Sequence, residues 1–323
     1  MAHAAVAEVS DDGVRAAATY SAAHRGTWLL VLERGKTRLN VRQNRGEKAG
    51  KIFSGTKAFW SIAALAAQED GLLDLDERVS ATLPEWGSDP QKSAVTLRQL
   101  LNFTSGLEPS FSLHNDRWAD RDAHARARMI VAAPGSSFIY GPAGLQVFHA
   151  VLARKLAARG KETPTHFLER RVLRPLGLGR QRYLADRAGQ PLLATGFTMT
   201  AVQWARLGQL VLAGGAPVLK RGPGQALRGS NANPMFGLGF WNNRLAGSFG
   251  EVEPEAMLAR KWHQQSWTNS CLCRAAPPDL IASVGSGGQR LYVVPSKQLV
   301  VVRLGHVTDF SDGAFLRALF SQP

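Results

Sequence analysis

The sequence predicts an α/β protein in which an antiparallel sheet, flanked by helices and built from both termini, carries an inserted all-helical domain. Strand-like runs occur near the N-terminus and again after residue 236, whereas helical patterns fill the segment between them. Hydrophobic residues make up 45% of the 323 residues, enough for a large buried core. The expected organisation is an α/β region at 13–75 and 236–323, a mainly helical region at 76–235, and a loose leader at 1–12.

The N-terminal strands form a predicted hairpin. Residues 27–33 and 37–41 are apolar or alternating, and a glycine turn at Gly35 separates them. An apolar, alanine-rich helix follows from Ser54 and is expected to end at Gly71.

Helices are predicted for most of the middle of the chain. Thr96 and Thr200 each precede an apolar helical run in the way of a capping residue. Further helices are predicted at 116–131, 143–158 and 164–173.

Strand patterns return at the C-terminal end. The clearest pair is 290–294 and 299–304, joined as a hairpin across Pro295 to Gln298. Two earlier strands are predicted at 236–241 and 280–284, and a last helix at 312–320.

Composition excludes several classes of protein. The 39 basic and 25 acidic residues give a net charge of +14, but they are scattered and no recognition motif accompanies them, so nucleic-acid binding is not expected. Cys271 and Cys273 lie too close for a comfortable disulfide, and two ligands make no zinc site; no metal or cofactor is expected. No apolar run approaches the roughly 18 residues that span a bilayer.

The compartment and the oligomeric state are left open by the sequence. The first residues lack the basic leader and sustained apolar core of an intact signal peptide. The expectation is a soluble protein, periplasmic or secreted if a signal peptide has been removed and otherwise cytoplasmic.

Ser54 and Lys57 are the leading catalytic candidates. Residues at i and i+3 share a helix face, so the hydroxyl and the amine can point to one spot. The positive end of the helix dipole and desolvation both lower a lysine pKa. This is the Ser-x-x-Lys pattern of an activated serine, although such a pattern alone is more often a cap followed by a solvated lysine.

Two further stretches strengthen that interpretation, and the three together carry a resemblance. They are Ser54-Gly55-Thr56-Lys57, Tyr140-Gly141-Pro142 and Gly285-Ser286-Gly287-Gly288-Gln289. In this order the chain resembles the serine β-lactamase and penicillin-binding-protein superfamily, and most of all its class C β-lactamase-like and esterase branch, over about residues 27–320. The resemblance implies the β-lactamase/transpeptidase-like fold.

The resemblance also implies roles for individual residues. Ser54 would form an acyl-enzyme on an ester or amide, with Lys57 and Tyr140 managing the proton as one coupled pair in which the ammonium favours the phenolate. The oxyanion would be held by the backbone N–H groups of Ser54 and Gln289. The residues expected to contact substrate are Ser286, Gly287, Gly288 and Pro142.

Two departures bear on the substrate. Pro142 stands where the superfamily has an asparagine, and Ser286 stands where it has a lysine or histidine. Without that amide and that cation, an esterase or amidase is favoured over a true β-lactamase or carboxypeptidase.

The alternative hypothesis is a catalytically weak or inactive relative that binds anionic cell-envelope material. The basic composition favours it, whereas the intact set of Ser54, Lys57 and Tyr140 disfavours it. The preferred partner is therefore a small-molecule or peptide-like ester or amide.

Overall fold

A six-stranded antiparallel sheet forms the framework of the protein. The computed structural model describes residues 8–43, 49–115, 117–246, 250–307 and 309–320. The strands lie in the order β2-β1-β10-β9-β8-β5, so the first and last parts of the chain meet where β1 pairs with β10. Their bounds are β1 Gly26–Glu33, β2 Lys36–Arg42, β5 Trp241–Asn242, β8 Ile281–Gly285, β9 Gln289–Val294 and β10 Leu299–Gly305.

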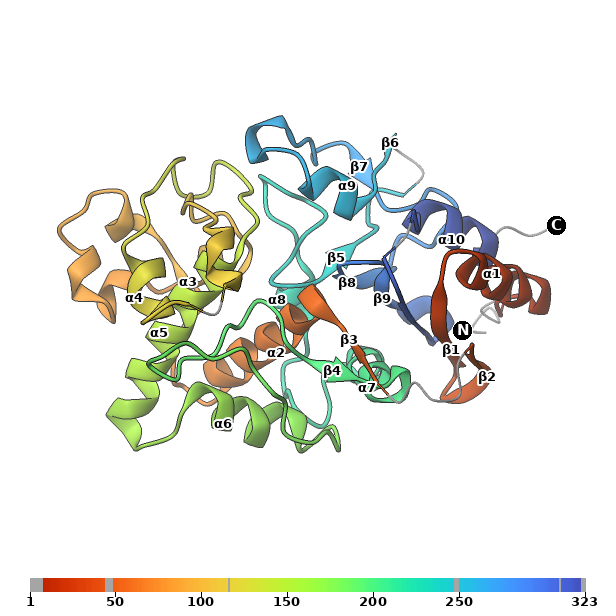
Figure 1. Ribbon diagram of the computed structural model, residues 1–323, viewed down its shortest axis with the longest axis horizontal. Helices are drawn as coiled ribbons and strands as arrows, with labels where there is room; N and C mark the ends of the chain where they lie inside the picture. Colours follow the sequence, from red (N-terminus) through yellow and green to blue (C-terminus); the bar gives the residue numbers. More distant parts are fainter. Residues whose placement is uncertain (1–7, 44–48, 116, 247–249, 308, 321–323) are drawn as a thin grey trace, which may run out of the picture.

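Helices cover both faces of this sheet. Helix α1 (Asp11–Ala23) packs against α10 (Asp312–Phe320) on one face, and the two lie side by side in Figure 1. Helix α7 (Ala201–Leu212) contacts β1, β9 and β10 on the other face. Side chains alternate along β9 accordingly: Tyr292 stacks on Phe315 of α10, while Leu291 approaches Gly208 of α7.

Helix α2 (Thr56–Glu69) is the central element. Every residue from Thr56 to Ala67 is buried, which is typical of a helix enclosed by other elements on all sides. Figure 1 shows it between the sheet and the helices α3 (Leu97–Leu101), α4 (Arg121–Arg126) and α5 (Pro142–Arg159).

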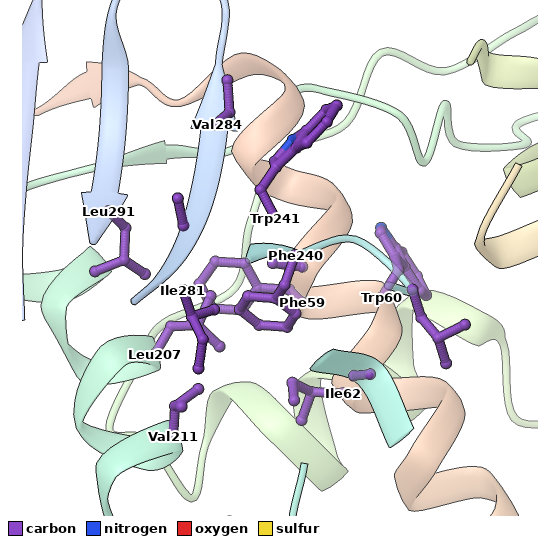
Figure 2. Close-up of a cluster of buried hydrophobic side chains, with 14 of the residues drawn as sticks. Phe59, Trp60, Ile62, Leu207, Val211, Phe240, Trp241, Ile281, Val284 and Leu291 are labelled. Atoms are coloured by element: carbon purple, nitrogen blue, oxygen red, sulfur yellow. The ribbon is translucent and has the colours of Figure 1, made fainter. Parts of the chain in front are cut away.

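The core on the sheet side of α2 is drawn in Figure 2. Phe59 and Ile62 of α2 meet side chains of α7 and of the sheet there, whereas Trp60 lies on the other side of the helix, beside Tyr183. Burying such large apolar side chains contributes about 1.5–3 kcal/mol each, so this cluster holds the start of α2 firmly. The partners labelled in Figure 2 are Leu207, Val211, Phe240, Trp241, Ile281, Val284 and Leu291.

The remaining elements are short. The short helices are α6 (Pro164–Leu168), which continues as a π-helix at Glu169–Leu173, α8 (Gly224–Leu227) and α9 (Pro254–Leu258). Two pairs of two-residue strands lie outside the main sheet: β3 (Gly50–Lys51) with β4 (Thr198–Met199), and β6 (Gly250–Glu251) with β7 (Ser270–Cys271). In the described residues, no helix is long and apolar enough to cross a membrane.

The predicted fold class is confirmed: an antiparallel sheet is flanked by helices, and both ends of the chain contribute to it. Thr96 and Thr200 each make a capping box with the glutamine three residues later. The predicted bounds of the α/β region and of the inserted helical region stay a prediction.

Three expectations about elements were wrong. The helix expected at 116–131 is limited to α4, because the buried Arg121 guanidinium donates to the carbonyls of Leu113, Leu184 and Asn115 and ties the preceding chain into a loop. The strand expected at 236–241 is a tight turn in which Phe236 pairs with Trp241. The expected leader ends earlier than residue 12, because Ser10 caps α1; residues 1–7 lie outside the described residues.

Candidate active site

Ser54 and Lys57 meet at the start of α2. Ser54 lies in the 3₁₀ turn Phe53–Gly55, and Lys57 lies in the first turn of the helix. The Lys57 Nζ atom is 2.8 Å from Ser54 Oγ and also 2.8 Å from the carbonyl oxygen of Ala194. The i, i+3 spacing therefore places both groups on one face, as the sequence predicts.

The Lys57 amine is buried, with 4% of the residue exposed. Its hydrogen-bond partners among the described residues are a hydroxyl and a carbonyl, and burial lowers its pKa to about 7. Desolvation disfavours the charged form of an amine. A large fraction of Lys57 is therefore neutral near physiological pH and has a lone pair available.

The backbone around Ser54 is fixed by close packing. Phe53 has a φ of 45°, a left-handed conformation that bulky residues adopt rarely and mostly at functional sites. Gly55 faces the indole of Trp204, and a Cβ at this position would lie 2.5 Å from its Cζ2 atom. The second residue of Ser-Gly-Thr-Lys is thus a glycine for lack of space.

Tyr140 approaches the same two side chains from the segment before α5. Its ring centroid is 4.8 Å from Lys57 Nζ and 4.8 Å from the ring of Phe103. Burial raises the pKa of Tyr140 well above its usual value, and a hydrogen bond with Ser54 opposes that rise only in part. Desolvation of the phenol therefore acts against the phenolate that was expected beside Lys57.

A cavity of about 290 Å³ opens over these groups. It brings together the three residues predicted to be catalytic and two of those predicted to contact substrate, Pro142 and Ser286. The full lining comprises Ser54, Lys57, Phe111, His114, Tyr140, Gly141, Pro142, Trp241, Glu255, Leu258, Ala259, Val284 and Ser286.

Glu255 is a lining residue that the sequence did not reveal. Its carboxylate accepts hydrogen bonds from the N–H groups of Gly287, at 2.9 Å, and Gly288, at 3.1 Å, and from Arg290 Nη2, at 2.8 Å. The two glycines are outside the cavity lining, with their N–H groups directed to Glu255. Their assignment as substrate-binding residues stays a prediction.

Gln289 begins β9 beside the cavity. Its side-chain amide donates to the carbonyls of Gly287 and Gly305 and accepts from the Gly305 N–H, so the side chain is fully used within the protein. Gln289 is not part of the cavity lining, although Ser286 and Val284 are. The oxyanion role of its backbone N–H stays a prediction.

The remainder of the lining is mostly apolar. Phe111, Trp241 and Leu258 supply large hydrophobic side chains. His114 also lines the cavity, and burial lowers its pKa, with the Lys57 charge adding to the effect. In the described part of the chain, no three His, Cys, Asp or Glu side chains form a group that could hold a metal ion.

Comparisons with known proteins agree with this geometry. The family model described as Beta-lactamase matches residues 5–318. Lovastatin esterase of Penicillium rubens is 29% identical over 202 residues, which is 54% of this chain and 49% of that protein; the chain thus spans about half the length of that relative. An acyltransferase, calJ of Penicillium decumbens, is 42% identical over 76 residues, 19% of this chain and 18% of that protein.

Solved structures show the same fold. The hydrolase EstCE1, described as having promiscuous acyltransferase activity, aligns with a TM-score of 0.69 and 19% identity over 96% of this chain and 99% of its own. A class C β-lactamase from Rhodobacter sphaeroides aligns with a TM-score of 0.68 and 18% identity over 96% and 97% of the two chains. At these identities the likeness is one of fold.

Proposed function

The chain belongs to the Beta-lactamase family, and on that premise we propose that it is a serine hydrolase that forms an acyl-enzyme on Ser54. The observation that carries the proposal is the contact between a buried Lys57 amine, with a pKa of about 7, and the Ser54 hydroxyl at 2.8 Å. A neutral amine within hydrogen-bond reach of a hydroxyl is the arrangement that a general base needs.

In the first half of the reaction, Ser54 attacks the substrate carbonyl. One N–H of Lys57 stays bonded to the Ala194 carbonyl, and the lone pair of Nζ accepts the proton of Ser54 as its Oγ forms the new bond to carbon. The carbonyl oxygen becomes an oxyanion, for which the backbone N–H of Ser54 is one expected donor.

In the second half, the leaving group departs and water completes the reaction. The raised pKa of Tyr140 keeps its hydroxyl protonated, and its hydrogen bond with Ser54 places that proton beside the reacting oxygen. Tyr140 can pass its proton to the leaving oxygen and recover one from Lys57. Water then attacks the acyl carbonyl and gives a proton to Lys57, and this proton passes to Ser54 Oγ as the bond to the acyl carbon breaks and the acid is released.

The finer proposal is an esterase that prefers uncharged, apolar acyl groups. Phe111, Trp241 and Leu258 present hydrophobic surface, whereas Glu255, which is paired with Arg290, adds carboxylate oxygens to the lining. Among the described residues, Lys57 is the one lysine or arginine in this lining, and it is already committed to Ser54. A substrate carboxylate would therefore find no dedicated cation and would face Glu255, which disfavours β-lactams and D-amino-acid peptides.

The names of two similar proteins also support the proposal of an esterase. Lovastatin esterase and the hydrolase EstCE1 are both described by activity on acyl groups. For this protein, the preference for uncharged acyl groups is inferred mainly from the apolar lining and from Glu255.

Covalent labelling tests the nucleophile. Mass spectrometry after incubation with a fluorophosphonate should show one adduct on the wild-type protein and none on Ser54→Ala. An adduct that persists in Ser54→Ala would overturn the assignment.

A pair of esters tests the preference for uncharged substrates. Hydrolysis of p-nitrophenyl butyrate should exceed that of the p-nitrophenyl monoester of succinate, which carries a carboxylate at the acyl end. Glu255→Gln should narrow this ratio, because it removes the charge and keeps a similar shape. A ratio that is the same in both proteins would contradict the role given to Glu255.

A further inference from the structure

The end of β8 lies against the turn that carries Ser54. A Cβ on Gly285 would overlap the carbonyl oxygen of Ile52, so the two backbone segments touch there. The hydroxyl of Ser283 also donates to the carbonyl of Gly55, at 3.3 Å. The peptide group that follows β8 is therefore placed beside the proposed nucleophile.

The backbone N–H of Ser286 is available at this cavity. Ser286 lines the cavity together with Ser54 and lies in the turn between β8 and β9, and its N–H donates to none of the residues that the structure describes. The N–H groups of Gly287 and Gly288, by contrast, both donate to Glu255. Of these three consecutive donors, the one of Ser286 is left for a substrate.

The carbonyl of the same peptide group is held by Arg290. Its Nη1 atom donates to the oxygen of Gly285 at 2.8 Å and to the oxygen of Gln289 at 3.0 Å. Arg290 lies on β9 opposite Val284 of β8, so its guanidinium reaches both ends of the turn. The peptide between Gly285 and Ser286 is thus anchored at its oxygen.

The guanidinium of Arg290 has a single orientation. Its Nε and Nη2 atoms donate to the two carboxylate oxygens of Asp312, at 2.7 and 2.8 Å, and Nη2 also donates to Glu255 at 2.8 Å. With the two bonds from Nη1, all five N–H groups of the rigid fork have an acceptor. The residue is 1% exposed, so turning it would leave buried donors without partners.

A held carbonyl fixes the direction of the N–H in the same peptide group. The bond before Ser286 is trans, and in a planar trans peptide the C=O and the N–H point in opposite directions. The oxygen of Gly285 points to Arg290, which is packed against Asp312 of α10. The N–H of Ser286 therefore points away from this buried ion pair.

We propose that Arg290 is a positioning residue for the oxyanion, and that the donor it positions is the N–H of Ser286 rather than that of Gln289. This inference rests on the proposed acyl-enzyme chemistry, in which the N–H of Ser54 is the first donor. Donors that are aimed in advance at the developing charge stabilise it without reorganisation. Ser286 is part of the cavity lining and Gln289 is not.

The fluorophosphonate adduct of Ser54 tests the donor directly, because its phosphonyl oxygen stands in for the oxyanion. In ¹H–¹⁵N spectra we expect the Ser286 amide proton to move downfield in the adduct, since it gains an acceptor. The amide proton of Gly287 is already bonded to Glu255 and should move little. An adduct in which Ser286 does not move downfield would overturn the proposal, and a downfield shift at Gln289 would identify that residue as the donor. Ser54 would still be the nucleophile in that case, whereas a protein that forms no adduct would contradict the proposed function.

Two substitutions of Ser286 test the N–H by kinetics. Ser286→Pro deletes the N–H, whereas Ser286→Ala deletes only the hydroxyl; the residue is exposed, so both variants should fold. Each is assayed with an ester and with the matching thionoester, whose sulfur accepts hydrogen bonds poorly. In Ser286→Pro we expect kcat for the ester to fall about 10²–10³-fold, the usual cost of losing one oxyanion donor, and the ester-to-thionoester ratio to fall with it. Ser286→Ala should keep the wild-type ratio, and an unchanged ratio in Ser286→Pro would contradict the assignment.

A lysine in place of Arg290 separates positioning from stability. Arg290→Lys leaves a cation for Asp312, but one ammonium cannot also hold the Gly285 carbonyl in the same geometry. We expect kcat for the ester to fall about 10–10²-fold with KM little changed, and the ester-to-thionoester ratio to fall, because a small misplacement of a reacting group costs about that much.

The control for this variant is Asp312→Asn. It disturbs the same buried pair but leaves the bond from Arg290 Nη1 to Gly285 in place, so it should lower the free energy of unfolding in urea and keep the ester-to-thionoester ratio. A wild-type ratio in Arg290→Lys, or the same loss of ratio in both variants, would mean that Arg290 acts through stability alone and would contradict its positioning role.

Discussion

Two buried cations of this protein differ in whether a carboxylate contacts them, and this difference separates a reactive group from a structural one. Lys57 is 4% exposed and Arg290 is 1% exposed. Lys57 has a hydroxyl and a carbonyl as partners, and burial lowers its pKa to about 7. Burial also works against the charge of Arg290, but Asp312 accepts from its Nε and Nη2 atoms and holds the pKa above its usual value.

Arg303 lies between these two cases. It is fully buried and donates to the carbonyls of Gly288 and His24, and burial lowers its pKa to about 10. With a pKa of about 10, this guanidinium stays charged at neutral pH although burial lowers the pKa from its usual value. The comparison teaches that burial without a carboxylate prepares a base, whereas burial with one builds a permanent ion pair.

Removing the Lys57 amine should have the largest effect. Lys57→Met keeps the length and apolar stem of the side chain but deletes the group that takes the proton of Ser54. We expect kcat/KM for an activated ester to fall about 10²–10⁴-fold, the usual contribution of a general base, while the fold is retained. Steady-state kinetics and circular dichroism measure the two quantities.

The control for this variant is another lysine. Lys36→Met changes an exposed lysine at the start of β2 and should leave kcat/KM unchanged. Wild-type activity in Lys57→Met would remove the amine from the mechanism.

Removing the Arg290 guanidinium should act on stability. Arg290→Met leaves Asp312 buried without its cation, and breaking one half of a buried pair costs about 3–5 kcal/mol. Urea unfolding measures this loss. Arg317→Met, which removes an exposed partner of Glu251, should cost only about 0–1 kcal/mol. Equal losses in the two variants would mean that the buried pair has no special role.

Crowding the turn that carries Ser54 should produce a smaller loss. A Cβ in Gly55→Ala would meet Trp204 at 2.5 Å, and overpacking of this kind costs about 1–3 kcal/mol. Activity should fall together with stability, because the neighbouring Ser54 shifts. Gly179→Ala, with nothing within 4 Å of its Cβ, is the matched control in the unfolding experiment. A fully stable and active Gly55→Ala would show that the contact with Trp204 does not position Ser54.

The pH dependence of stability should carry a contribution from Lys57. The pKa of Lys57 is about 7 in the folded protein against an unperturbed 10.5. Between these values the unfolded chain binds one proton more, so the free energy of unfolding should rise with pH by about 1.4 kcal/mol per unit from this group. Lys57→Met should lack that part of the slope in urea titrations at pH 7.5 and 9.5. The same slope in both proteins would contradict the lowered pKa.

Much of the fold is predictable because its signals are local. The hairpin strands, the capping residues Thr96 and Thr200 and the last helix, 312–320, follow from runs of adjacent residues. The N-terminal helix was missed although Ser10 and the acidic first turn of α1 are ordinary start signals. The expected strand at 236–241 failed because tertiary contacts fold Phe236 back on Trp241.

The residues of the site likewise divide into those that a local motif marks and those that it does not. Ser54 and Lys57 are one turn apart on a helix, and Tyr140 precedes another helix start, so their motifs can be read from the chain. Glu255 and His114 reach the cavity from α9 and from a separate 3₁₀ turn, and no local pattern marks them. The pKa values of Lys57 and Tyr140 depend on burial, which the sequence does not give residue by residue.

The most direct test of the account is the pKa of Lys57 itself. The ¹³Cε resonance of Lys57, assigned by its loss in Lys57→Met, can be followed against pH, together with kcat/KM for a neutral ester. We expect a transition near pH 7 in the chemical shift, and kcat/KM that rises around the same pH as the amine loses its proton. A Lys57 that titrates near 10.5, with no change in activity around pH 7, would contradict the claim that burial without a carboxylate makes this amine the base for Ser54.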